Sequence, residues 1–109
     1  MIFKHSIMNS KQLDRICEME QRLDLIEKVV TNLSEALDRY TEVQDAIESL
    51  DAYYSSDEWR KDFEDDAAGK LPKELKRGVL SEDAVWNLLT EVDELNKRLE
   101  TFAKTANNK

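Results

Sequence analysis

The stretch Glu58–Trp86, EWRKDFEDDAAGKLPKELKRGVLSEDAVW, decides the fold, because it separates two long amphipathic segments and holds every glycine and proline of the chain. Gly69, Pro72 and Gly78 lie close together within it. Glycine and proline interrupt regular helices, so their concentration in one place marks a single specified connection. The sequence therefore predicts two long helices joined by a compact unit.

Length and composition define the class of the protein. The chain has 109 residues, of which 37% are charged and 40% hydrophobic. This length suits one domain with a modest core. The apolar residues recur with helical period, and the high charge indicates solvated helices rather than disorder. We predict an all-α fold: a long antiparallel, coiled-coil-like helical hairpin with a short helical cap between its two long helices.

The charge and the cysteine content limit the binding partners, the disulfide bonds and the compartment that we expect. A net charge of −8 disfavours direct binding to nucleic acid and to anionic membranes, which both require a cationic surface. The single cysteine, Cys17, excludes an intramolecular disulfide and favours the reducing cytoplasm. We interpret residues 1–9 as a flexible leader with no signal-peptide core, in which Met8 is an alternative start. No segment predicts a membrane span.

The first long segment carries a coiled-coil seam, in which apolar residues alternate at spacings of three and four. After Tyr40 the phase slips, and Gln44 occupies a seam position. We predict one helix over residues 10–54; the alternative is a break at Thr31-Asn32, where poor helix formers gather. The seam residues are Ile16, Met19, Leu23, Ile26, Val30, Leu33, Leu37 and Tyr40.

Residues 55–80 are predicted to form the cap. Ser55 and Glu58 match a capping box that opens a short helix ending near Gly69. Pro72 suits the first turn of a further helical piece, closed by Gly78 in a left-handed conformation. The large apolar side chains of this region predict a miniature core rather than a ligand-stacking site. Its expected members are Trp59, Phe63, Leu71, Val79, Leu80 and Trp86.

A second long helix is predicted over residues 81–104, followed by a polar tail at 105–109. Ser81 offers a hydroxyl cap, and Glu82 and Asp83 place carboxylates where the helix dipole favours them. The apolar positions 85, 88, 92, 95, 99 and 102 again alternate by three and four. This helix is therefore expected to pack antiparallel to the first one.

Two acidic patterns raise the question of a metal site. Residues 57–66 hold six acidic groups, and three pairs with i, i+3 spacing resemble the magnesium ligands of all-α nucleotide pyrophosphatases: Glu35 with Asp38, Glu48 with Asp51, and Glu91 with Glu94. Helical spacing spreads the cluster around the helix, and such pairs arise by chance in an acidic chain. We predict no metal, no cofactor and no catalytic residue; His5 lies in the leader, away from any partner.

Residues 67–80 reverse the charge, with four basic groups and one acidic group. On a short helix, Lys73, Lys76 and Arg77 would share one face and could bind an acidic partner or a phosphate. The alternative is that the basic groups, with Lys70, answer the acidic helix across the cap in weak surface ion pairs.

Two motifs in the connecting stretch are fairly specific. The pattern E-W-x-x-D is formed by Glu58, Trp59 and Asp62, and L-P-x-x-L-K-R-G-V-L-S-E-D runs from Leu71 to Asp83. Over roughly residues 12–102 the chain resembles a family of small bacterial proteins known as domain of unknown function 4298. The resemblance implies a discrete fold in bacteria or their phages. It implies no activity.

The length of the first helix predicts self-association. At 1.5 Å per residue it spans roughly 67 Å against about 36 Å for the second helix, so Ile16, Met19, Leu23 and Ile26 need another cover. A homodimer would bury them; a fold back at Thr31-Asn32 would do so within one chain. We expect a non-enzymatic module that binds a protein partner through the seam and the cap. The alternatives are a metal-dependent hydrolase of a phosphorylated small molecule and an acidic, phage-type mimic of nucleic acid.

Overall fold

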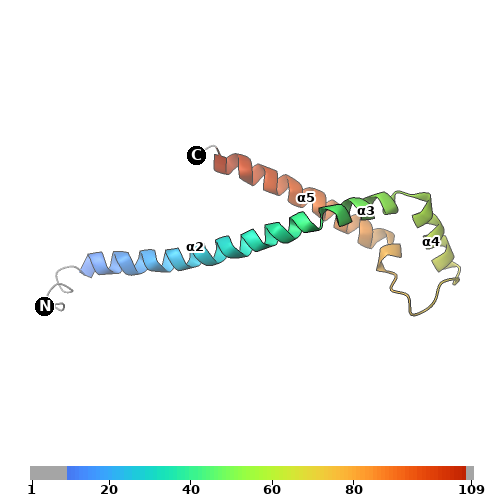
Figure 1. Ribbon diagram of the computed structural model, residues 1–109, viewed down its shortest axis with the longest axis horizontal. Helices are drawn as coiled ribbons and strands as arrows, with labels where there is room; N and C mark the ends of the chain where they lie inside the picture. Colours follow the sequence, from blue (N-terminus) through green and yellow to red (C-terminus); the bar gives the residue numbers. More distant parts are fainter. Residues whose placement is uncertain (1–9, 108–109) are drawn as a thin grey trace. The chain divides into compact units, whose positions relative to one another are not determined.

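A computed structural model describes residues 10–107 of the chain. The elements in order are α2 (Ser10–Glu42), α3 (Gln44–Tyr54), α4 (Asp57–Ala67), the 3₁₀ turn η1 (Gly78–Leu80) and α5 (Glu82–Asn107) (Figure 1). Within these residues there is no strand. The all-α class is confirmed, as is a helical hairpin with a short cap: α3 and α5 contact each other, and α4 and η1 lie between them in the chain. The predicted leader, residues 1–9, lies outside the described residues.

The chain divides into two units at Val43. The first contains α2, which runs without interruption through Thr31-Asn32, so the alternative break does not occur there. The range predicted as one helix, 10–54, instead contains two helices separated by Val43, whose amide donates to the carbonyl of Arg39 over 3.2 Å. This interruption falls where the seam loses its phase, between Tyr40 and Gln44. The second unit, from Gln44 to the end of α5, is called the capped hairpin below.

The cap of α4 is Ser56, one residue later than predicted. The Ser56 hydroxyl accepts from the Trp59 amide over 3.2 Å and donates to the carbonyl of Tyr53 over 2.6 Å. Ser55 cannot serve, because its own amide still donates to the Asp51 carbonyl at the end of α3. The expected hydroxyl cap thus exists, but the turn of the preceding helix shifts it by one position.

Glycine closes α4 rather than the segment after it. Gly69 has φ of 74°, its amide donates to Asp66, and the Lys70 amide donates to Asp65, which is the Schellman arrangement. The predicted left-handed role of Gly78 is wrong: Gly69 is the only glycine with positive φ, and Gly78 begins η1.

The helical piece predicted from Pro72 to Gly78 does not form. One turn, from the Leu75 amide to the Pro72 carbonyl, is the local structure there. The Arg77 guanidinium donates to the carbonyls of Pro72 and Lys73 at 2.6 and 3.4 Å. A helix would offer these carbonyls to backbone amides, so the arginine side chain replaces the helical pattern.

The core of the capped hairpin is small. Trp59, Leu80 and Val85 are its buried residues, with exposed fractions of 8%, 7% and 4%. The Trp59 ring packs on Tyr54 and Phe63, with centroids 5.1 Å apart in each pair, and its Nε1–H donates to the Val79 carbonyl over 2.8 Å. The prediction of Trp59 and Leu80 as core residues agrees with this burial, and Phe63 and Leu71 are half-buried.

Two residues assigned to this core lie at the surface. Trp86 is 59% exposed and Val79 is 38% exposed, so the predicted core position of both is wrong. Trp86 follows the buried Val85 directly, which rotates its side chain by about 100° from the inward face of α5. Val79 contributes through its carbonyl, which holds the Trp59 indole.

The start of α5 is tied to the end of α3. The Ser81 hydroxyl accepts from the Ala84 amide over 3.2 Å, as expected for a cap, and the Tyr54 hydroxyl donates to the Glu82 carbonyl over 3.3 Å. The helix continues to Asn107, three residues beyond the predicted end at 104, so most of the predicted tail is helical. These contacts fix the turn of the hairpin.

Candidate functional site

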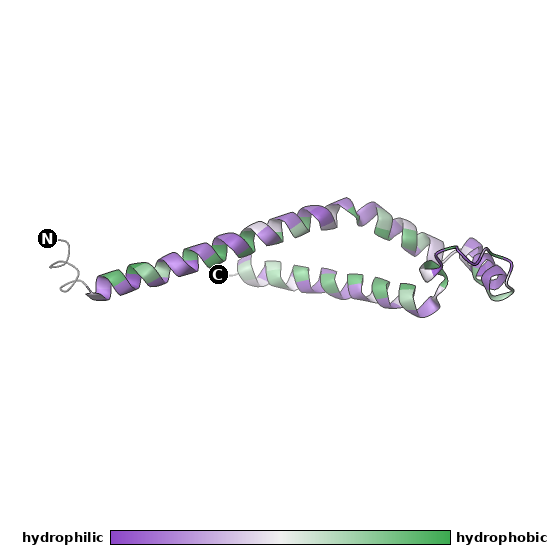
Figure 2. Ribbon diagram, turned by 90° about the horizontal axis from the view of Figure 1, so that it is seen from below, coloured by the Kyte–Doolittle hydropathy of each residue, from purple (hydrophilic) through white to green (hydrophobic). Residues whose placement is uncertain are grey.

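A long row of mostly exposed apolar side chains lies along α2. We call it the α2 seam; its members are Ile16, Met19, Leu23, Ile26, Val30, Leu33, Leu37 and Tyr40. Apart from Tyr40, which is half-buried, they are between 42% and 58% exposed, and α2 contains no buried residue. Hydrophobic bands recur along this helix in Figure 2. The alternating spacing places the seam on one face, as in a coiled coil.

The exposed seam leaves a large free energy of burial unused. Ile16, Met19, Leu23 and Ile26 are each about half exposed, so completing their burial alone would contribute roughly 3 to 6 kcal/mol, a large amount beside the stability of a typical domain. The helix α5 has 26 residues, whereas α2 and α3 together have 44, so about 39 Å of helix cannot line about 66 Å. Apolar stripes with this spacing are typical of coiled-coil and helix-in-groove contacts.

The borders of the seam carry opposite charges. In heptad positions, Ile16 and Leu23 are a residues, and Met19 and Ile26 are d residues. Arg15 and Arg22 then occupy g positions along one border, and Glu20 and Glu27 occupy e positions along the other. All four side chains are exposed, and within one chain Arg22 pairs with Glu18 over 2.5 Å on the open helix surface. In coiled coils these border charges select the partner and its orientation.

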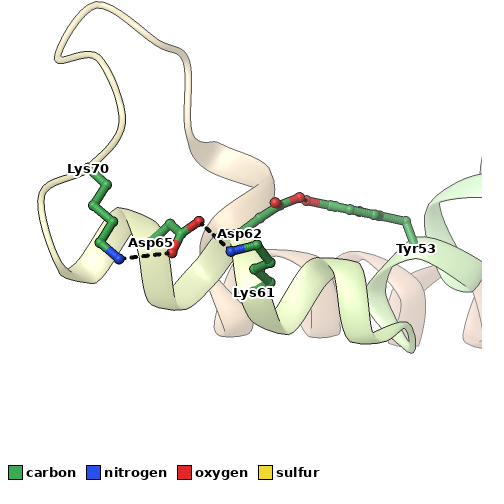
Figure 3. Close-up of polar contacts among 5 residues, drawn as sticks. All are labelled: Tyr53, Lys61, Asp62, Asp65 and Lys70. Carbon is green, nitrogen blue, oxygen red and sulfur yellow. Dashed lines mark hydrogen bonds and ion pairs between the residues drawn. The ribbon is translucent and has the colours of Figure 1, made fainter.

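The acidic helix α4 takes part in a polar network with Tyr53 and two lysines. The Tyr53 hydroxyl donates to Asp62 over 2.6 Å, while Asp65 pairs with Lys61 at 3.3 Å and with Lys70 at 3.9 Å (Figure 3). The hydrogen bond to Asp62 is the main cause that raises the pKa of Tyr53 to about 12, with burial and the charges of Asp62 and Glu58 adding to it. Tyr53 therefore joins α3 to α4 as a neutral donor.

The basic residues of the cap do not share a face. The Arg77 guanidinium pairs with Asp66 of α4, and Lys70 pairs with Asp65. These two contacts agree with the alternative in which the basic groups form ion pairs with the acidic helix. Lys73 and Lys76 are exposed in the irregular segment before η1, so the predicted helical face of Lys73, Lys76 and Arg77 is wrong. Its physical basis is absent because no helix forms there.

The carboxylate pairs remain separate. Glu35 and Asp38 lie on α2, Glu48 and Asp51 on α3, and Glu91 and Glu94 on α5. Within residues 10–107, no three His, Cys, Asp or Glu side chains gather closely enough to hold a metal ion.

A shallow hollow on α2 is lined by residues of successive turns on one helix face, so it cannot enclose a small molecule. Its lining residues are Asp24, Glu27, Lys28, Thr31 and Asn32.

A second exposed apolar set lies on α5, and sequence reasoning identified it only in part. The seam positions Leu88, Leu95 and Phe102 are 49%, 39% and 69% exposed. The exposed Trp86 precedes Leu88 by two residues on the same helix. Trp86 was missed as a surface residue because its aromatic character suggested burial. Its i−4 and i+4 neighbours, Glu82 and Thr90, are both polar and were the signal of an outward position.

Most of the described chain matches a known protein family. The family described as Domain of unknown function (DUF4298) matches residues 16–102. No curated protein and no solved structure matches the chain. No helix within residues 10–107 combines the length and the hydropathy that a membrane crossing requires. The matched range includes the α2 seam from its first member, Ile16, together with nearly all of the capped hairpin.

Proposed function

The chain belongs to the DUF4298 family, which brings no defined activity, and we propose that it is a non-enzymatic module that binds another protein. The observation that carries this proposal is the α2 seam: a regular apolar stripe on a helix with no buried residue. Helix-in-groove and coiled-coil contacts use this spacing of apolar anchors. The capped hairpin, with its own small core, would be the folded body that the seam attaches to a partner.

The features of the capped hairpin support this division of roles. Its aromatic contacts, helix caps and ion pairs are satisfied within the unit, and they account for Tyr53, Trp59 and Arg77 as structural residues. The proposal therefore assigns binding to α2. The exposed set on α5 is a secondary candidate surface. We place the protein in the bacterial cytoplasm, in keeping with its single cysteine.

A matched pair of variants tests the proposal. Leu23 lies in the seam and is 49% exposed, while Leu25 lies two residues away, outside the seam, and is 62% exposed. Neither is buried in α2, so Leu23→Glu and Leu25→Glu should both retain helical circular dichroism. Affinity capture with each tagged variant, from a bacterial lysate that also contains the untagged wild-type chain, should give proteins that bind the wild type and Leu25→Glu but not Leu23→Glu.

Two results would contradict a protein-binding role for the seam. The first is an identical set of captured proteins for wild type and Leu23→Glu. The second is tight magnesium binding by calorimetry together with hydrolysis of a phosphorylated nucleotide, which would favour the hydrolase alternative. In that case Asp62, Glu82 and Asp83 would be the first carboxylates to replace.

A further inference from the structure

We propose that the partner helix on the α2 seam is α2 of a second copy of this chain, paired parallel and in register. This inference rests on the proposed function, because it names the occupant of the same seam. The argument comes from the border charges, which distinguish the possible pairings of one seam with another.

In a parallel pair, each g residue faces the e residue of the following heptad on the other helix. Arg15 then faces Glu20 of the second copy, and Arg22 faces Glu27. Because the pair is symmetric, each contact occurs twice, and four pairs of opposite charge border the first two heptads. All of these side chains are exposed, and the pair that Arg22 makes with Glu18 within one chain lies on the open helix surface.

An antiparallel pair lacks these contacts. In this orientation g faces g and e faces e. When the same eight seam residues are covered, Arg22 faces Ala36 and Glu20 faces Ser34, so neither charge finds an opposite partner. Glu27 faces its own copy, which is repulsive. The pattern of charges thus favours the parallel orientation and opposes the other.

The seam itself fits a self-pairing along the whole of α2. In a parallel pair each apolar residue meets its own copy, and the layers continue from Ile16 to Tyr40. The next a position is Gln44, and the helix is interrupted at Val43, immediately before it. The pairing surface therefore ends where α2 ends.

Disulfide trapping tests the orientation and the register. In a Cys17→Ser background, Met19→Cys and Leu33→Cys each place a thiol at a d position. A parallel, in-register pair brings each thiol to its own copy, within the short Cα separation that a disulfide requires, so both single variants should form linked dimers under mild oxidation. Antiparallel pairing would bring Met19 to Leu37 and Leu33 to Leu23, and neither variant would link. Gln21→Cys, on the outer face at position f, is the matched control and should stay unlinked.

A charge exchange tests the border contacts without touching the seam. Arg22→Glu and Glu27→Arg should each weaken self-association, since each creates two like-charge contacts, whereas an equimolar mixture should form heterodimers with at least tenfold preference over either homodimer. Equal association of all three samples would overturn the parallel register.

The mass of the wild-type protein completes the test. Light scattering at tens of micromolar should give twice the mass of one chain. A monomeric mass, or a mass of three or four chains, overturns this inference. If the wild type is monomeric while capture from lysate still depends on Leu23, the seam binds a different protein and the proposed function stands. If capture does not depend on Leu23, the proposed function itself fails.

Discussion

The capped hairpin and α2 have the same kind of apolar periodicity but use it differently. In the capped hairpin, Trp59, Leu80 and Val85 are buried among residues of α3, α4 and η1. On α2, no side chain is buried, and the seam is open from Ile16 to Leu37. The difference shows that helical periodicity predicts an apolar face but does not say which residues pack against it. One region completes its core internally, and we propose that the other is covered by a second chain.

The largest effect is expected from a substitution that disrupts the proposed contact between two α2 helices. Leu23→Glu removes two leucines per dimer, each contributing roughly 1.5 to 3 kcal/mol when buried, so the dissociation constant should rise by roughly 10² to 10⁴. Sedimentation equilibrium measures the change, and Leu25→Glu is the matched control. A dissociation constant that is unchanged in Leu23→Glu would show that the seam is not the interface.

In the capped hairpin, the corresponding substitution is at Trp59, which lies in the core. Trp59→Ala should lower the free energy of unfolding by about 3 to 5 kcal/mol, because the indole is 8% exposed, packs on two rings and donates to Val79. Urea unfolding followed by circular dichroism measures it. Trp86→Ala provides the control with the same chemistry: at 59% exposure it should cost less than about 1 kcal/mol. A larger loss for Trp86 than for Trp59 would contradict the described core.

A smaller effect is expected at the start of α4. Ser56→Ala removes the hydroxyl that accepts from the Trp59 amide and should cost about 1 kcal/mol. Ser55→Ala, one residue earlier, should leave the free energy of unfolding nearly unchanged, since its hydroxyl does not cap the helix. Thermal unfolding of the two variants side by side separates these positions. The reverse order would restore Ser55 as the cap.

The smallest expected effect appears only at high pH. The pKa of Tyr53 is raised from 10.0 to about 12 in the folded protein by its hydrogen bond to Asp62. Because the folded-state pKa is the higher one, this contact stabilises fully below pH 10 and is lost as the pH rises to about 12. The stability difference between wild type and Tyr53→Phe should therefore shrink across this window. A difference that stays constant from pH 9 to 12 would exclude the coupling.

Much of the fold could be predicted from periodicity and helix caps. The alternation from Ile16 to Tyr40 and the serine before Glu82 are local signals, and the helices start and end close to them. The path from Lys70 to Arg77 could not be predicted, because it depends on the Arg77 side chain reaching Asp66 and two carbonyls. Such contacts depend on the turn of the chain at Gly69, which follows α4.

The residues of the α2 seam could be predicted from the sequence, but the surface that covers them could not. The seam residues follow from spacing alone, and so do the border charges once the heptad is assigned. Trp86 could not be placed from its residue type, since a tryptophan suits a core and a surface equally; its position one residue after Val85 decides the matter. The cover that we propose for the seam is a second chain, which neither the spacing of the seam residues nor the structure of one chain can show.

Amide hydrogen exchange tests the central contrast most directly, because it measures α2 and the capped hairpin in one experiment. Wild type, Leu23→Glu and Leu25→Glu are compared at the same micromolar concentration. We predict that Leu23→Glu loses protection along α2 while the amides of α4 and of the start of α5 keep theirs, and that Leu25→Glu matches the wild type. Equal protection of α2 in wild type and Leu23→Glu would contradict the account, since protection of the α2 amides would then not depend on a second chain.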